Sequence, residues 1–395
     1  MSVNEGEERK AVASIAARIA DIDADAWNAC ANPGAATFNP FIAHAFLLAL
    51  EESGSVGERH TAWIPQHITI DDGTGGIAAC APCYAKLNSS GEYVFDHSWA
   101  SAYAHAGGRY YPKLQIAVPF TPVPGRRLLV RADVDAAHYT NVLASAAAAL
   151  CDRLGASSVH VTFLSQQEWE ALGSQGYLLR NDQQFHWRNE GYATFEDFLG
   201  SLASRKRKAV RKEREQALLG SDIVIERLTG AAIKEKHWDA FFDFYTDTGS
   251  RKWGQPYLNR RFFSLLGASM AERCLLIMAK RGRHYIAGAF NLIGGDCLYG
   301  RYWGALEPHP YLHFEVCYYQ AIDYAIAHGL ARVEAGAQGE HKLARGYVPT
   351  PTYSAHWIAD PGLRRAIARY LQDERAAVAE SIAELAAFGP YRKDA

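Results

Sequence analysis

Two carboxylates in the last third of the sequence have the surroundings that proton transfer would need. Glu315 belongs to a predicted helix over residues 312–328, on a stripe that also holds Tyr319, Ile322 and Ile326. A carboxylate on a largely apolar stripe can act as a general base. Close to a helix N-terminus it can instead cap or pair, because negative charge is favoured there. The sequence leaves both interpretations of Glu315 open.

The second carboxylate, Glu334, lies on a short predicted strand and is followed by a polar loop with two glycines. The polar side chains of this loop are Gln338, Glu340, His341, Lys342 and Arg345. A polar loop after a buried strand is a common place for a site, and a histidine changes charge near neutral pH. We therefore take Glu315, Glu334 and His341 as candidate catalytic residues. Lys342 and Arg345 are candidate substrate-binding residues, and a solvated loop with ordinary ion pairs is the alternative.

Adjacent cations follow another predicted helix, over residues 237–248, in the sequence Thr248-Gly-Ser-Arg-Lys-Trp-Gly. Arg251 or Lys252, beside Trp253, could bind a phosphate or carboxylate group of a substrate. The alternative is a helix C-cap whose cations complement the helix dipole.

A third group of candidates lies in an aromatic tract of the first half, over residues 93–124. Asp96 and His97, together with Tyr93 and Lys113, could form a wall against an acceptor molecule. Aromatic rings beside polar groups are suited to such a surface. A satisfied His–Asp pair in the core explains Asp96 and His97 as well.

Cations crowd residues 205–214, at Arg205, Lys206, Arg207, Lys208, Arg211, Lys212 and Arg214. On one helix they would repel one another, since the first acidic side chain is Glu213. A polyanion such as tRNA, a nucleotide-linked precursor or a phosphopantetheine carrier would relieve that repulsion. Most charge runs are solvated faces, so both interpretations stay open. A protein that only binds nucleic acid would lose affinity steeply with salt.

Composition narrows the class of protein. The 395 residues carry a formal net charge of −2, which gives no general attraction to nucleic acid or anionic lipid. The polar start of the sequence and the lack of a long apolar run argue against a secretory signal and a membrane span. The seven cysteines have no framework spacing and Cys80-Ala-Pro-Cys83 stands alone, so we expect reduced thiols, no metal site and a cytoplasmic protein. Hydrolase, metalloprotease and nucleotide-binding motifs are absent from the sequence.

The order of predicted elements indicates a duplication. The length suits two domains of about 150–200 residues each. Each half has a run of strands, then a long helix, a glycine and a short strand. Gly155-Ala-Ser-Ser-Val-His aligns with Gly329-Leu-Ala-Arg-Val-Glu, which matches the glycine and the valine. A repeat of that length indicates a duplicated α/β unit rather than a solenoid.

The order of the predicted elements and several stretches of sequence together resemble the FemAB-like branch of the GNAT superfamily. That branch is described as peptidoglycan biosynthesis or recognition proteins and predicted N-acyltransferases. The most specific stretches are Tyr93-Val-Phe-Asp-His-Ser-Trp-Ala, Tyr110-Tyr-Pro-Lys-Leu-Gln, Ser204-Arg-Lys-Arg-Lys-Ala-Val-Arg-Lys-Glu-Arg, Thr248-Gly-Ser-Arg-Lys-Trp-Gly and Glu334-Ala-Gly-Ala-Gln-Gly-Glu-His-Lys. The resemblance implies a mixed α/β fold of tandem GNAT-like acyltransferase domains, each a mixed central sheet flanked by helices. We expect an N-terminal helical segment over 1–34 and GNAT-like domains over 35–190 and 191–362. A basic helix over 195–218 opens the second domain, and a C-terminal helix covers 363–395.

One segment departs from the pattern of GNAT acetyltransferases. Those enzymes hold the coenzyme A pyrophosphate on a [R/Q]-x-x-G-x-[G/A] loop, whose N–H groups lie at a helix N-terminus. The nearest segment here is Arg301-Tyr-Trp-Gly-Ala-Leu, in which Leu306 replaces the small residue. Pro308 and Pro310 also remove N–H donors. Arg301 stays a candidate substrate-binding residue, and a carrier-linked donor fits better than free acetyl-CoA.

The resemblance implies an N-acyltransferase or aminoacyltransferase that moves an acyl group from a thioester or tRNA-linked donor to an amine acceptor. The acceptor would be a small molecule or a peptide. No permanently bound cofactor is implied, and the donor would be acyl-CoA, acyl carrier protein or aminoacyl-tRNA. The tRNA or carrier protein would contact the basic helix over 205–214. The alternative is a non-catalytic binder of peptidoglycan-type or nucleotide-linked ligands.

Overall fold

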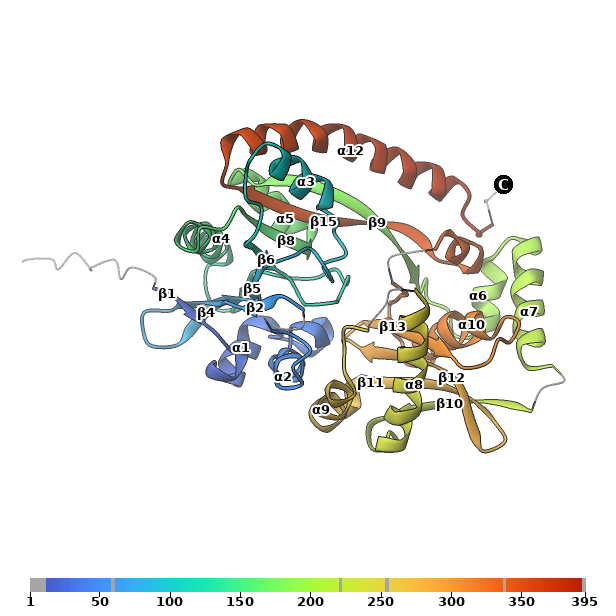
Figure 1. The fold of residues 1–395 in the computed structure, drawn as a ribbon. Helices are drawn as coiled ribbons and strands as arrows, with labels where there is room; N and C mark the ends of the chain where they lie inside the picture. The colour runs from blue at the N-terminus through green and yellow to red at the C-terminus, as the bar shows by residue number, and fades with distance from the viewer. Residues whose placement is uncertain (1–11, 58–60, 220–221, 253–255, 337–338, 393–395) are drawn as a thin grey trace, which may run out of the picture.

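The computed structural model describes residues 12–57, 61–219, 222–252, 256–336 and 339–392. It has the mixed α/β fold that the sequence predicts, a central sheet with helices packed on both faces (Figure 1). We call the residues before Gly191 the first half, and those from Gly191 to Tyr347 the second half.

One sheet of eleven strands runs through both halves. From one edge to the other its strands are β10 (Ile223–Thr229), β11 (Cys274–Arg281), β12 (His284–Ile293), β13 (Cys297–Ala305), β14 (Arg332–Glu334), β9 (Leu178–Arg188), β15 (Val348–Ile358), β8 (Ser158–Leu164), β6 (Lys113–Ile116), β5 (Cys83–Lys86) and β2 (Trp63–Pro65). The predicted antiparallel meander is present as β11, β12 and β13. The two halves are therefore joined by backbone hydrogen bonds as well as by side-chain packing.

A smaller sheet pairs β1 (Ala13–Ala16), β3 (His67–Asp71), β4 (Ile77–Ala81) and β7 (Leu129–Val130). The start of the chain corrects a prediction, since we expected helix over residues 1–34. Ala13–Ala16 instead pairs antiparallel with Ile70–His67, because sheet pairing overrides the helix propensity of alanine. Among the described residues, a 3-10 turn at Ile19–Asp21 follows, and the first α-helix is α1 (Ala24–Ala31), which Asp23 caps.

The helices of the first half are α2 (His44–Glu52), α3 (His97–His105), α4 (Ala136–Arg153) and α5 (Gln166–Ser174). Those that follow are α6 (Phe195–Ser201), α7 (Ser204–Leu218), α8 (Glu235–Lys252), α9 (Arg260–Met270), α10 (Leu312–Phe314), α11 (Gln320–Ala327) and α12 (Pro361–Ala387). Capping boxes at Ser165 and Thr194 start α5 and α6.

Two predicted helices are interrupted. The helix expected over 195–218 is divided into α6 and α7, because Leu202 is extended and forms a β-bridge with Tyr391. The helix expected over 312–328 contains one π-helical segment, Glu315–Tyr319, between α10 and α11. Such π segments occur frequently at functional sites.

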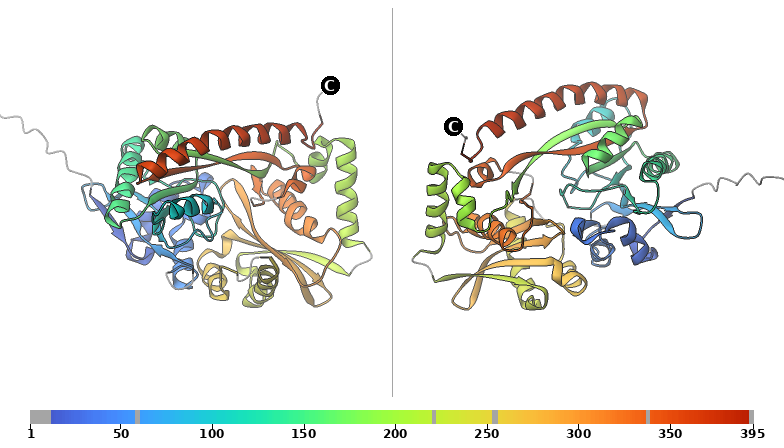
Figure 2. Two further views of the ribbon diagram at one scale, coloured as in Figure 1. Left: turned by 45° about the horizontal axis from the view of Figure 1, so that its top comes forward. Right: turned by 180° about the vertical axis from the view of Figure 1, so that it is seen from behind.

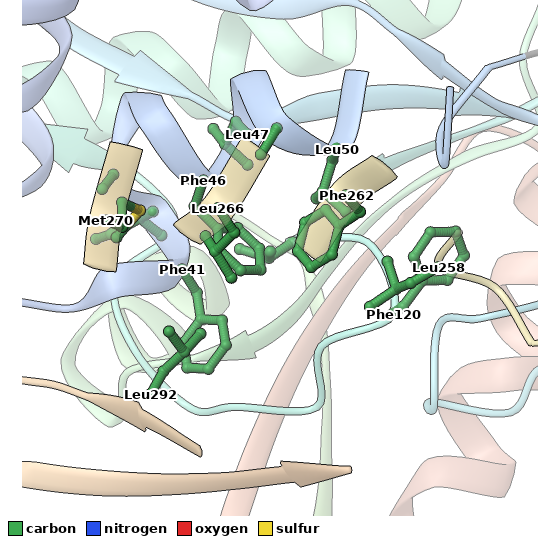
Figure 3. Packing of buried hydrophobic residues seen from close by; sticks show 14 of the residues in the cluster. Phe41, Phe46, Leu47, Leu50, Phe120, Leu258, Phe262, Leu266, Met270 and Leu292 are labelled. Carbon is green, nitrogen blue, oxygen red and sulfur yellow. The ribbon is translucent and has the colours of Figure 1, made fainter. Parts of the chain in front are cut away.

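A core of aromatic and aliphatic side chains holds the two halves together. Phe41, Phe46 and Leu50 from the first half pack against Phe262 and Leu292 from the second (Figure 3). The rings of Phe46 and Phe262 meet edge to face, with centroids 5.7 Å apart. This packing fixes the relative position of the halves on one face of the large sheet.

The halves repeat the same strand pairing. In the first half, β6 and β8 are parallel and pair Leu114 with Val159 and Gln115 with His160. In the second half, β13 and β14 are parallel and pair Leu298 with Val333 and Tyr299 with Glu334. His160 and Glu334 thus hold equivalent positions, as the sequence alignment of the two halves predicts.

The C-terminal part crosses from one half to the other. β15 and α12 follow the second half in sequence, yet β15 pairs with β8 and β9 of the first half. α12 packs on the first half near its start and extends beside the sheet to the second half (Figure 2). There the Tyr391 hydroxyl donates to the Gly346 carbonyl at 2.6 Å. No helix in the described part of the chain is long and apolar enough to cross a membrane.

Candidate active site

β13 and β14 separate soon after they begin to pair. Their parallel pairing covers three residue pairs, and the last of them is Tyr299 with Glu334. β14 ends at Glu334, whereas β13 continues to Ala305 beside β12. We call the point of separation the fork. The segment from the fork to β15 is called loop 335–347; within it, Glu340–Arg345 form a 3-10 helix.

Arg301, just beyond the fork, is an extra residue in β13. Gly300 pairs with Asn291 and Tyr302 with Phe290, which leaves Arg301 as a β-bulge. Bulges redirect a side chain and are common beside active sites. The Nη2 of Arg301 donates to the carbonyl of Phe120, in the first half, at 2.6 Å.

Tyr93 lies close to this bulge. Burial raises the pKa of its hydroxyl, the neighbouring Tyr302 raises it further, and the positive charge of Arg301 opposes the rise. The structure therefore brings together two of the predicted substrate-binding residues, Tyr93 and Arg301, from different halves.

Glu334 is buried at the fork, with 3% of its surface exposed. Its Oε1 accepts a hydrogen bond from Nε of Arg332 at 3.1 Å. Its Oε2 has no hydrogen-bond partner within the described residues, and Nε2 of His186 lies 4.0 Å away. Buried carboxylate oxygens are normally satisfied, so an unpartnered one is a candidate proton acceptor.

Lys342 is a buried cation on loop 335–347. Its Nζ donates to the carbonyl of Gly336 at 2.7 Å, and no carboxylate in the described ranges forms an ion pair with it. Burial lowers the pKa of this ammonium to about 8, so it is still mainly charged at pH 7. An ammonium held in this way attracts an anionic group.

His341 lies on the same loop and is exposed. Its Nε2 lies 2.9 Å from the hydroxyl of Tyr318, and its ring contacts that of Phe314. Burial of part of the ring, then the charges of Arg345 and Lys342, lower the pKa of His341. The imidazole is therefore neutral at pH 7 and able to accept a proton.

Two other predicted residues form ion pairs with the basic helix. Glu315 accepts two hydrogen bonds from Arg214 of α7, at 3.0 and 3.1 Å, and a third from Gln320 at 2.7 Å. Arg345 donates to both oxygens of Glu213, at 2.8 and 3.1 Å. These contacts hold α7 against the π-helix and the loop. They also occupy the Glu315 carboxylate, which a general base would need to have free.

The acceptor wall predicted in the first half is divided by the fold. Asp96 and Lys113 are buried together, and Lys113 donates to Asp96 and, at 2.7 Å, to Glu92. His97 instead lies on the surface, stacked on Phe95 with ring centroids 6.2 Å apart. The His–Asp pair considered from the sequence is not formed, because His97 points to the surface, and Lys113 and the Tyr110 hydroxyl both donate to Oδ2 of Asp96 instead.

The remaining candidates lie at or beyond the end of a described range, residues 222–252. Arg251 and Lys252 are the last residues of α8, and their side chains lie outside the described part of the structure. Trp253 lies wholly outside it. Their predicted roles stay predictions.

Contacts and charges connect some of the candidates and separate others. No hydrogen bond or ion pair within the described ranges joins Glu315, Glu334 and His341. Burial lowers the pKa of His186, the Glu334 carboxylate opposes that change, and the Lys342 ammonium adds to it, so both candidates act on His186. His186 was missed from the sequence. Its only signal there was a polar residue between two aromatic ones, Phe185 and Trp187.

Two hollows in the surface lie away from the fork. One of about 10 Å³, lined in part by Phe41, Arg301 and Tyr302, is too small for a ligand. A wider one of about 470 Å³ lies between Phe38 and Arg273. Neither is lined by Glu334, His341 or Lys342. Across the described chain, no group of three or more His, Cys, Asp or Glu side chains could hold a metal ion.

Comparison of the sequence with models of known protein families identifies the family of this chain. A model of the FemAB-like family, described as peptidoglycan biosynthesis/recognition, matches residues 18–393. The chain belongs to the FemAB-like family. Membership confirms the resemblance found in the sequence and makes this FemAB-like protein a transferase. Among curated proteins, none matches the chain.

Solved structures show the same fold at low identity. A conserved protein of unknown function from Bacteroides thetaiotaomicron is 11% identical, with a TM-score of 0.53 over 88% of this chain and 100% of that one. L-PGS from Bacillus licheniformis is 11% identical, with a TM-score of 0.50 over 85% and 98%. The C-terminal domain of a putative lysylphosphatidylglycerol synthetase from Agrobacterium fabrum is 7% identical, with a TM-score of 0.51 over 89% and 96%. The fold is the tandem GNAT-like arrangement that the sequence predicts.

Proposed function

We propose that this FemAB-like protein is an N-acyltransferase or aminoacyltransferase in which an amine attacks an acyl donor at the fork. The observation that carries the proposal is the buried, unpartnered Oε2 of Glu334 where β13 and β14 separate. The description of the family favours an acceptor amine of the peptidoglycan-precursor type. We therefore propose that the acceptor is an amine on a peptide or on a small molecule.

In the proposed reaction, Glu334 accepts one proton from the acceptor ammonium. The free amine then attacks the acyl carbon, so that a C–N bond forms through a tetrahedral intermediate. The C–S bond of a thioester or the ester C–O bond of an aminoacyl-tRNA breaks. The second amine proton leaves with the thiol or hydroxyl, and no covalent enzyme intermediate is needed.

Two loop residues support this chemistry. Lys342 supplies positive charge for an oxyanion or for a carboxylate of the substrate. His341, neutral at pH 7 and beside Tyr318, is a second proton carrier at the exposed edge of the loop. Glu315 is not part of the proposed machinery, because Arg214 and Gln320 already bind it.

The donor in this proposal is acyl-CoA, acyl carrier protein or aminoacyl-tRNA, and no cofactor is bound permanently. Arg205, Lys208 and Lys212 are exposed on α7, and none of them forms an ion pair with a described residue. Their charge favours an anionic donor. α7 is also linked to the loop, because Arg345 bridges Glu213 and the His341 carbonyl, which it reaches at 2.6 Å. We place the reaction in the cytoplasm, where donors of this kind occur.

The test is a transfer assay with three donors: acetyl-CoA, an acyl-loaded carrier protein and radiolabelled aminoacyl-tRNA. The acceptor is a muropeptide with a free amino group. Glu334→Gln keeps the size of the side chain but cannot accept the proton, so we expect turnover to fall about 100-fold or more. Acceptor binding, measured by calorimetry, should be unchanged.

Glu196→Gln is the matched control, since Glu196 is an exposed carboxylate that pairs only with Arg211 among the described residues. It should retain full activity. Undiminished turnover in Glu334→Gln would contradict the proposed base. Acceptor binding without transfer from any of the three donors would favour the non-catalytic binder instead.

A further inference from the structure

The duplication places a pair of buried side chains at the same position in each half. In the first half, His160 of β8 lies opposite His356 of β15. In the second half, Glu334 of β14 lies opposite His186 of β9. His160 and Glu334 occupy equivalent places beside β6 and β13. The two cross-strand pairs are therefore structural counterparts.

The pair in the first half is closed. The two Nδ1 atoms of His160 and His356 lie 2.7 Å apart, which is hydrogen-bond distance. Their Nε2 atoms reach Ser158 and Ser354, at 2.7 and 3.0 Å. All four ring nitrogens have partners, so this pair has no free group to offer a substrate.

The pair in the second half is open. His186 Nε2 and Glu334 Oε2 lie 4.0 Å apart, and both residues are at most 5% exposed. Glu334 Oε2 has no hydrogen-bond partner in the described chain. A small movement of either side chain would bring the two atoms into hydrogen-bond contact.

Gln184 determines which tautomer His186 adopts. The Nε2 of Gln184 donates to the carbonyl of Pro122 at 2.8 Å, so its Oε1 is the atom that faces His186 Nε2, 3.3 Å away. Two acceptors would repel each other, so His186 Nε2 carries the proton. That N–H lies between Gln184 Oε1 and Glu334 Oε2.

His186 also lies at the base of loop 335–347. It pairs with Glu334 on one side, where the loop begins, and with Val348 on the other, where the loop ends. The charged groups around it come from three elements: Glu334 and Arg332 from β14, Arg188 from its own strand, and Lys342 from the loop.

We propose that His186 is a positioning residue whose Nε2–H holds Oε2 of Glu334 toward the fork while the carboxylate accepts the amine proton. This rests on the proposed function, in which Glu334 is the base. Gln184 sets the tautomer, and the first half retains the same architecture in a closed form that serves stability alone.

The first test does not need activity. In the full-length protein labelled with ¹⁵N-histidine, we expect His186 as the Nε2–H tautomer with a pKa below the usual range. Glu334→Gln should lower that pKa further, because the carboxylate is the anion that raises it. Glu196→Gln should leave it unchanged. An Nδ1–H tautomer, or the same His186 pKa in wild type and Glu334→Gln, would overturn the proposal.

The second test is kinetic. His186→Leu removes the donor, so kcat should fall about 10- to 100-fold while KM for the acceptor changes by less than about threefold. His186→Gln can restore a donor and should recover most of kcat, which a purely structural role would not predict. Equal loss in both variants would overturn the positioning role.

The two proposals fail in distinguishable ways. Loss of transfer in Glu334→Gln with an unchanged His186 pKa would leave the proposed function standing and overturn the role of His186. A lowered His186 pKa in Glu334→Gln, together with full transfer activity, would show that the two residues are in contact. It would also overturn the proposal that Glu334 is the base.

Discussion

At the scale of single residues, the first half shows how buried charges are kept stable. Lys113 is fully buried and is bound by Glu92 and Asp96. Burial raises the pKa of Glu92 to about 7 and lowers that of the neighbouring Lys86 to about 7. Charges this deep persist only when paired, because desolvation costs several kcal/mol for each ion. Glu334 follows the same rule through its ion pair with Arg332, and its Oε2, like Oε1 of Glu92 and Oδ1 of Asp96, is a buried oxygen without a hydrogen-bond partner among the described residues.

The closed histidine pair predicts acid lability. Burial, then the charge of Lys113, lowers the pKa of His160 to about 3, and burial lowers that of His356 well below its usual range. The unfolded chain therefore binds more protons than the folded one below pH 6.5, and stability is lost as the pH falls towards about 3. In His160→Gln, we expect the slope of the unfolding free energy against pH to be smaller by about 1.4 kcal/mol per pH unit, as measured by urea unfolding.

His328→Gln is the control, since His328 is a histidine stacked on Tyr324 at the surface, and its slope should match that of the wild type. If His160→Gln is too unstable to titrate, proton uptake on acid unfolding of the wild type measures the same quantity. Equal slopes in wild type and His160→Gln, or no uptake, would contradict the prediction.

At the scale of elements, close packing keeps β13 in the geometry that forms the fork. Gly304 lies against the backbone of α8, and a Cβ there would lie 2.1 Å from the carbonyl oxygen of Phe244. The bulge at Arg301 and the π-helix at Glu315–Tyr319 lie on either side of this contact in sequence. A bulge in one strand and a π-helical segment in one helix therefore place two candidate side chains, those of Arg301 and Glu315.

Gly304→Ala should destabilise the protein by about 3 kcal/mol, because neither backbone can move aside without shifting α8 or β13. Gly200→Ala is the control, since a Cβ at Gly200 of α6 would meet no atom within 4 Å. Alanine there should raise stability by up to about 1 kcal/mol. Urea unfolding of both variants checks the contrast, and similar stabilities would contradict it.

At the scale of the whole molecule, the two halves differ in the charged side chains they carry at equivalent places. In the first half, the fully buried Arg127 donates to the carbonyls of Val123 and Thr162, and so fills the space beyond the paired ends of β6 and β8. In the second half, the basic α7 is linked to loop 335–347 by the ion pair of Glu213 with Arg345. The first half thus fills this space with a side chain of its own, whereas the second half carries the exposed cations of α7.

The basic face of α7 predicts salt-dependent binding of the donor. Replacing Arg205, Lys208 and Lys212 by glutamine should weaken tRNA binding and reduce the slope of log affinity against log salt by about 2. Arg365→Gln with Arg369→Gln, exposed on α12, is the control and should change neither. Unchanged tRNA affinity in the α7 variant, measured by filter binding at several salt concentrations, would contradict the proposed donor contact.

The sequence by itself determined the class of fold, the duplication and the family. These depend on local signals: the turns of the meander, the glycine before each short strand, and the motif at Glu334. It also identified loop 335–347, because a polar, glycine-jointed loop after a buried strand is visible in the chain itself. The break in the helix over 195–218 was not visible, since it depends on Tyr391, far away in sequence.

Only the tertiary structure decided which candidates remain available for chemistry. Arg214 occupies Glu315, Lys113 occupies Asp96, and β9 brings His186 beside Glu334. Each of these contacts joins residues that no local pattern relates, because strand order and helix packing set them. Periodicity can indicate that a carboxylate is buried, but whether it is paired or free depends on which distant cation the fold brings to it.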